Sequence, residues 1–191
     1  MQRGINPTST LNANSMEVVK VAITGPESSG KSDLTKYLAE KFQTSFAPEY
    51  AREYLEWRDG DYEYKDLIEI CEGQIANEER AIENANKIVF FDTDMLVLKI
   101  WSRYRFDSVP RNVALAFEQR QYDAVLLCKP DLPWIPDPLR ESPDEEERLF
   151  LFELFKRQVE AYYPNKFCKI EGQGIQRFKV AQDYLYNQFD I

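Results

Sequence analysis

The sequence predicts an α/β fold in three layers, with a five-stranded parallel sheet between two layers of helices and a lid segment. Apolar, β-branched runs alternate with helical patterns along the chain, which is typical of strands joined by right-handed helical crossovers. Residues 87–94 and 123–128 are almost continuously apolar, as expected for strands buried on both faces. A proline-rich stretch interrupts the pattern and predicts a lid over about 129–148.

The individual elements follow in chain order. Strands are expected over 18–24, 44–48, 87–94, 123–128 and 166–172. In the first helix, Leu34, Leu38 and Phe42 recur at four-residue spacing, which indicates an amphipathic face. Helices are expected over 31–42, 61–86, about 145–163 and 175–189, and in the stretch after residue 94. Residues 1–16 are polar and lack periodicity, so we expect a flexible leader or tag there and one folded domain over 17–191.

Composition excludes several classes of protein. The formal net charge is −9, which disfavours a nucleic-acid partner because such binders cluster Lys and Arg. The sequence has no histidine, which excludes His-ligated metals and Ser-His-Asp triads. No apolar run approaches the ~20 residues of a membrane span, and three widely spaced cysteines indicate free thiols. We therefore expect a cytoplasmic protein with a small-molecule ligand, and the sequence leaves open whether it forms a homo-oligomer.

Residues 25–32, GPESSGKS, match the phosphate-binding pattern G-x-x-x-x-G-K-[ST], the Walker A or P-loop motif. Small residues let successive backbone amides curl around an anion, and the following helix adds the positive end of its dipole. An ordinary Gly/Ser turn is the alternative, but a buried strand before the loop and an amphipathic helix after it favour a P-loop NTPase. The ATP-binding residues are expected to be Gly25, Pro26, Glu27, Ser28, Ser29, Gly30, Lys31, Ser32 and Asp33.

Two acids, Asp92 and Asp94, close the apolar run 87–94. On alternate positions of an extended segment they would point the same way and share one site. Both are candidates to hold Mg²⁺ together with the Ser32 hydroxyl, because a P-loop requires such an acidic partner. We expect one of them to hold the metal through water and the other, with Asp94 as the candidate, to accept hydrogen bonds from the second substrate. The alternative is that either acid merely caps the next helix.

The segment after the second strand, FAPEYAREYLE, is expected to face the phosphate acceptor. Glu49 is placed to orient or deprotonate a hydroxyl, Tyr50 to stack on a ring, and Arg52 to clamp a charged group. The alternative is structural: Glu49 would favour a helix N-terminus, and Arg52 would pair with Glu56 four residues on.

The lid and the last strand supply the remaining candidates. Arg140 is expected to reach the transferred phosphoryl group, whereas Arg148 is as well explained by a surface ion pair. Trp134 is expected to pack the lid or touch the substrate. Gly172 lies after the last strand and is expected to contact adenine, unless it only forms a turn.

A GTPase is disfavoured because LLCKPD has Cys128 where the guanine-binding pattern N-K-x-D has asparagine. A small chain with a lid favours phosphoryl transfer onto a metabolite. Lys31, Asp92, Glu49 and Arg140 are then the catalytic candidates, with Asp92 and Glu49 as rivals for the group that orients the acceptor. A different metabolite kinase and a regulatory ATPase switch remain as alternatives.

Four blocks, GPESSGKS, PEYAREYLE, FFDTDMLVLKIWS and LLCKPDLPWIPDPLRESP, resemble the NadR-like ribosylnicotinamide kinases, also classed as AAA_28. The resemblance covers about 18–185 and implies ATP-dependent phosphorylation of the ribose 5′-hydroxyl of nicotinamide riboside, a step of pyridine nucleotide salvage in NAD biosynthesis. It also implies that Lys31 and Ser32 serve ATP and Mg²⁺, that Asp92 and Asp94 serve metal and ribose, and that residues 48–50 border the riboside. Neither the adenylyltransferase nor the DNA-binding part of longer relatives is expected here.

Overall fold

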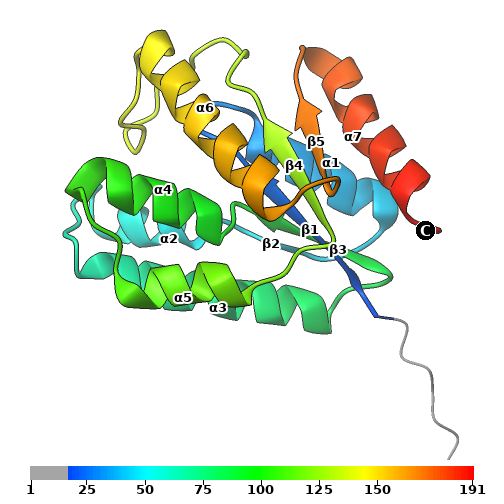
Figure 1. Ribbon diagram of the computed structural model, residues 1–191, viewed down its shortest axis with the longest axis horizontal. Coiled ribbons are helices and arrows are strands. Elements are labelled where there is room, and N and C mark those ends of the chain that lie inside the picture. The colour runs from blue at the N-terminus through cyan, green and yellow to red at the C-terminus, as the bar shows by residue number, and fades with distance from the viewer. Residues whose placement is uncertain (1–16) are drawn as a thin grey trace, which may run out of the picture.

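The structure is a computed structural model that describes residues 17–191, so the expected leader over 1–16 lies outside the described residues. Five parallel strands form one sheet in the order β2-β3-β1-β4-β5 (Figure 1). The strands are β1 (Val19–Thr24), β2 (Phe46–Ala47), β3 (Ile88–Asp92), β4 (Ala124–Cys128) and β5 (Phe167–Ile170). The helices are α1 (Lys31–Phe42), α2 (Tyr50–Trp57), α3 (Asp66–Glu83), α4 (Met95–Phe106), α5 (Arg111–Gln119), α6 (Glu145–Tyr162) and α7 (Gly174–Gln188).

Helices cover both faces of the sheet, which confirms the three-layer prediction (Figure 1). On one face α1 and α7 pack through Leu34, Leu38 and Leu185. On the other face α2 to α6 enclose a larger core. Every residue of β3 and β4 is buried, as their uninterrupted apolar runs predict. None of the helices within 17–191 is long and apolar enough to cross a bilayer.

The structure corrects three expected boundaries. The helix expected over 61–86 is shorter, and α2 precedes it as a separate helix. The stretch after β3 forms two helices, because Asp107 ends α4 in the left-handed region (φ 51°) and Pro110 precedes α5. The last residues of the expected lid belong to α6, whose N-cap Asp144 accepts a hydrogen bond from the Glu147 amide.

The strand register brings the functional loops together. Ile23 of β1 lies beside Asp92 of β3, and Thr24 lies beside Leu127 of β4. The loop after β1 therefore lies between the segment that follows β3 and the lid segment that follows β4. Ligands of open parallel sheets bind at this carboxyl edge.

Candidate active site

The loop after β1 has the backbone geometry of a phosphate-binding loop. Gly25 has φ 136°, and a Cβ there would lie 2.4 Å from the Cys128 carbonyl oxygen, so only glycine fits. Gly30 has φ 74° and directly precedes α1. The Ser29 hydroxyl and the Lys31 ammonium both donate to the Pro26 carbonyl, at 2.7 and 2.9 Å. The loop is thus curled on itself at the N-terminus of a helix, where anions are favoured.

Asp92 and Asp94 do not lie on one extended segment, which corrects the reason for pairing them. Asp92 ends β3, Thr93 takes a left-handed conformation (φ 68°), and Asp94 is the N-cap of α4. Asp94 Oδ1 accepts from the Thr24 hydroxyl at 2.8 Å and from the Val97 amide at 3.2 Å. The capping alternative is therefore right for Asp94, but capping uses only one of its oxygens.

The two acids nevertheless suit a divalent cation. Asp92 Oδ1 and Asp94 Oδ2 are buried and have no hydrogen-bond partner. Burial raises the pKa of Asp92, which the Ser32 hydroxyl and Lys31 partly lower, and burial raises the pKa of Asp94 to about 6. Among residues 17–191 no three potential ligands of the His, Cys, Asp or Glu type gather. Such a sparse set fits Mg²⁺, which retains waters and phosphate oxygens around one or two carboxylates.

A cavity of about 240 Å³ runs from this loop into the larger core. Its polar wall is the whole segment 25–33 together with Glu49, Arg52, Gln74 and Asp94. Its apolar wall consists of Leu55, Ile70, Val97, Leu98, Ile100, Trp101, Leu151 and Phe155. One space therefore joins a phosphate-binding loop to a pocket with aromatic and aliphatic sides.

Glu49 and Arg52 stand at the start of α2, on the wall of the cavity. Burial raises the pKa of Glu49 to about 6, although Lys31 nearby opposes that shift. The Arg52 guanidinium lies 3.6 Å from Glu56 and 2.7 Å from Asp137 of the lid. The ion pair with Glu56 that was the structural alternative for Arg52 is therefore present, and Arg52 also forms a second ion pair with the lid.

The structure places four predicted site residues outside the cavity lining: Asp92, Tyr50, Trp134 and Gly172. The Tyr50 ring packs on Gly73, where a Cβ would lie 2.2 Å from Cε1 of the ring. The Trp134 ring lies beneath the Arg140 and Arg148 guanidinium groups, at 5.5 and 4.7 Å. The Gly172 amide donates to Asp131 Oδ2 at 2.8 Å.

The lid lies against the phosphate-binding loop. The Glu27 carboxylate accepts hydrogen bonds from the Glu141 and Ser142 amides, at 3.0 and 3.1 Å. Arg140 Nη1 is 3.5 Å from the Ser28 hydroxyl. Arg148 is buried and donates to the carbonyls of Ser142 and Pro143, so it makes no surface ion pair. The lid thus places Arg140, and not Arg148, at the loop.

Sequence reasoning missed three residues at this edge of the sheet. Gln74 and Trp101 line the cavity from α3 and α4, and Arg177 of α7 contacts the phosphate-binding loop. None of them belongs to a short sequence motif. Helical periodicity predicts only the face of the helix on which each residue lies, and not the residues that it contacts. Their positions depend on contacts between distant parts of the chain.

Several known proteins are similar to this chain in sequence. Residues 20–177 match the family model AAA_28, described as an AAA domain. The trifunctional NAD biosynthesis/regulator protein NadR of Salmonella typhimurium is 31% identical over 177 residues, which are 88% of this chain and 43% of that protein. NadR of Escherichia coli is 37% identical over 133 residues, which are 67% of this chain and 32% of that protein. The chain thus spans less than half the length of these relatives.

Solved structures show the same fold. A NadR protein in complex with NAD and AMP-PNP superposes with a TM-score of 0.75 at 22% identity, over 92% of this chain and 50% of that one. A NadR protein in complex with NR gives 0.68 at 23% identity, over 88% and 52%. Deoxyadenosine kinase from M. mycoides with bound dATP gives 0.53 at 16% identity, over 88% and 99%. The resemblance inferred from the four sequence blocks is confirmed, and the chain belongs to the AAA_28 family of AAA domains.

Proposed function

We propose that the chain is an ATP-dependent kinase that phosphorylates the ribose 5′-hydroxyl of nicotinamide riboside to give nicotinamide mononucleotide. The observation that carries the proposal is the cavity that joins the phosphate-binding loop to an apolar pocket with a carboxylate at the junction. Such a space places a site for phosphates next to a site for a ring-bearing alcohol, as phosphoryl transfer between them requires. The names of the NadR relatives, and the NR and AMP-PNP in NadR structures, support the same activity.

The charge of the cavity favours this acceptor over a neutral nucleoside. Nicotinamide riboside has a positively charged pyridinium ring. The charged residues that line the cavity are five acids, Glu27, Asp33, Glu49, Asp94 and Glu141, and three cations, Lys31, Arg52 and Arg140. Trp101 and Phe155 belong to its apolar wall, and aromatic side chains suit a flat cation. A cationic ring would therefore meet aromatic surface and negative charge in one pocket.

In the proposed reaction the amides of the loop and Lys31 hold the triphosphate of ATP. Ser32, Asp92 and Asp94 are the residues that would hold Mg²⁺, which neutralises charge between the phosphates when it is bound. Glu49 accepts the proton of the acceptor hydroxyl or orients it, with Asp92 as the rival for this role. Most of the acceleration then comes from positioning and from charge stabilisation.

The lid completes the proposed site. Its closure would exclude water that otherwise hydrolyses ATP. Arg140 would stabilise charge on the transferred phosphoryl group from its position beside Ser28. Such a reaction needs only small-molecule partners and takes place where ATP is abundant, so we expect a cytoplasmic enzyme.

The test is to detect nicotinamide mononucleotide by mass spectrometry after incubation of the protein with ATP, Mg²⁺ and the riboside. A parallel panel of nucleosides, each assayed for ADP release with and without acceptor, ranks the substrates. Preference for another nucleoside would keep the kinase and replace its substrate. Slow ADP release that no acceptor accelerates, together with nucleotide-dependent association with another protein, would indicate a regulatory ATPase.

A further inference from the structure

Arg177 of α7 is a buried arginine at the carboxyl edge of the sheet, with a side chain that is 2% exposed. Its guanidinium makes four hydrogen bonds. Nη2 donates to the carbonyls of Ser29 and Lys129, at 2.6 and 2.8 Å. Nη1 donates to Asp131 Oδ1 at 2.7 Å and to the Gly172 carbonyl at 3.1 Å. One side chain thus connects the loops that follow β1, β4 and β5.

The bond to Ser29 fixes the direction of one peptide in the phosphate-binding loop. In a trans peptide the carbonyl and the amide of the next residue point in opposite directions. Because the Ser29 carbonyl points to Arg177, the Gly30 amide points away from Arg177. The left-handed conformation of Gly30 (φ 74°) accompanies this orientation. The Gly30 amide is therefore a hydrogen-bond donor on the side of the loop that faces away from Arg177.

The other three bonds hold the two loops beside the phosphate-binding loop. Asp131 accepts from Arg177 through Oδ1 and from the Gly172 amide through Oδ2, so both its oxygens are used. Lys129 and Gly172 direct their carbonyls to the same guanidinium. The planar fork of an arginine suits several carbonyls, whereas a lysine offers one nitrogen.

We propose that Arg177 is a positioning residue for the phosphate donor, which fixes the amide of Gly30 toward the triphosphate and holds the loops at 129–131 and 172 around the nucleotide. The inference rests on the proposed use of ATP and goes beyond it, because Arg177 does not line the cavity. It acts through the backbone of the loop that does. The acceptor pocket, which is built from α2, α3, α4 and α6, is not held by this side chain.

The test separates donor binding from acceptor binding. Arg177→Met removes all four bonds, Arg177→Lys keeps the charge, and Lys179→Met removes an exposed cation from the same helix as a control. We expect Arg177→Met to raise the Kd for AMP-PNP, measured by calorimetry without acceptor, by at least about tenfold, the effect of losing one bond to a charged ligand. Arg177→Lys should give a smaller rise and Lys179→Met none, and KM for the acceptor should stay within about twofold.

A merely structural role predicts a different result. Both Arg177 variants would then melt at a lower temperature, yet those that fold would bind AMP-PNP as the wild type does, and that outcome overturns the inference. If Arg177→Met does not fold, Arg177→Lys provides the same comparison. Failure of the wild-type chain to bind AMP-PNP would overturn the proposed function, whereas wild-type binding with an unchanged Arg177→Lys affinity would overturn this inference alone.

Discussion

The Arg52 guanidinium on α2 lies 2.7 Å from the carboxylate of Asp137, and this ion pair joins α2 to the lid. Asp137 Oδ1 also accepts from the Leu139 amide at 2.9 Å. These two hydrogen bonds hold the pKa of Asp137 below its usual value. The pair is partly exposed, so its expected contribution to stability is small, roughly 0–1 kcal/mol. A pair that contributes little to the stability of the fold can still hold the lid closed.

We predict that Asp137→Asn loosens the lid without destabilising the fold. The variant retains an oxygen for the Leu139 amide but loses the charge that faces Arg52. Water should then reach the phosphoryl group more often, so ATP hydrolysis per acceptor phosphorylated should rise about threefold to tenfold. Glu56→Gln, which changes only the exposed partner of Arg52, is the control. The same ratio of hydrolysis to transfer in all three proteins would contradict the prediction.

Lys31→Ala should abolish turnover and leave the fold intact. The Lys31 ammonium contacts the Pro26 carbonyl, a single bond within the loop. We expect Lys31 to bind the β- and γ-phosphates of ATP and to stabilise their charge, so kcat should fall by about 10³-fold or more in the variant. Circular dichroism should show a melting temperature close to that of the wild type. Lys41→Ala, an exposed lysine at the end of the same helix, should keep full activity.

The sequence predicted those parts of the site that are encoded locally. The strands, the phosphate-binding loop and its helix come from contiguous runs of residues, and all are where the pattern places them. The prediction that Asp92 and Asp94 lie on one extended segment was wrong. Thr93 between them has a positive φ, and nothing in the sequence indicates this turn. This turn, and not strand periodicity, makes Asp94 a helix cap.

Other parts depend on contacts that sequence patterns do not encode. The Tyr50 ring, for which the sequence suggested a contact with substrate, packs against Gly73 of α3. Arg177 and Ser29 are 148 residues apart in the chain, and only the completed sheet brings them together. From the sequence alone, a charged residue such as Arg177 is expected at the surface, because charged side chains are seldom buried without a partner.

Glu49 should control the acidic limb of the pH–rate profile. Burial raises its pKa to about 6, and a group that orients or deprotonates the acceptor must be ionised. We therefore expect kcat/KM to fall as the pH decreases through about 6. Glu49→Gln should lower kcat by about 10²-fold or more and remove this limb. A limb that persists unchanged in the variant would assign it to another buried carboxylate of the site, Asp92 or Asp94, and not to Glu49.

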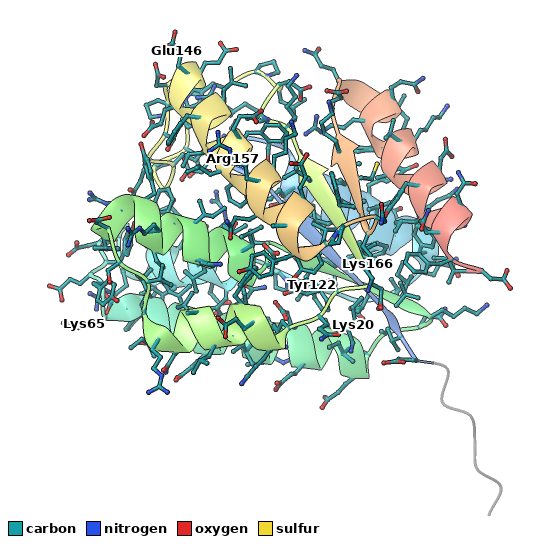
Figure 2. The ribbon with its side chains drawn as sticks, in the orientation of Figure 1. Lys20, Lys65, Tyr122, Glu146, Arg157 and Lys166 are labelled. Atoms are coloured by element: carbon teal, nitrogen blue, oxygen red, sulfur yellow. The ribbon has the colours of Figure 1, made fainter. Side chains whose placement is uncertain are left out.

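Glu78 should make the stability of the fold depend on pH from a buried position beside Gln74 and Asp94 of the cavity wall. Its side chain is 1% exposed, and its Oε2 lies 3.1 Å from Arg120 Nε. The hydroxyl of Tyr122, a residue labelled in Figure 2, is 3.4 Å from the Glu78 Oε1. Burial raises the pKa of Glu78 from 4.5 to about 7, because the loss of hydration disfavours the charged form by more free energy than the attraction of Arg120 returns.

The sign of the effect follows from proton uptake. Between pH 4.5 and about 7 the folded state binds more protons at Glu78 than the unfolded state, so the free energy of unfolding decreases as pH rises through this range. The contribution of Glu78 is fully present below pH 4.5, and its loss amounts to at most about 3 kcal/mol. Urea unfolding at several pH values between 5 and 8 measures this slope.

Glu78→Gln isolates the contribution of this one carboxyl group. The variant cannot titrate at residue 78, so its free energy of unfolding should change less with pH than that of the wild type. At pH 5 it should be about as stable as the wild type, whose Glu78 is already protonated in the folded state, and above pH 7 it should be the more stable protein, because only the wild type then buries a charged carboxylate at this position. Glu79→Gln, whose carboxylate is 66% exposed and 3.8 Å from Arg120, should retain the wild-type slope. Parallel curves for wild type and Glu78→Gln would show that Glu78 is ionised in the folded protein throughout this range, despite its burial.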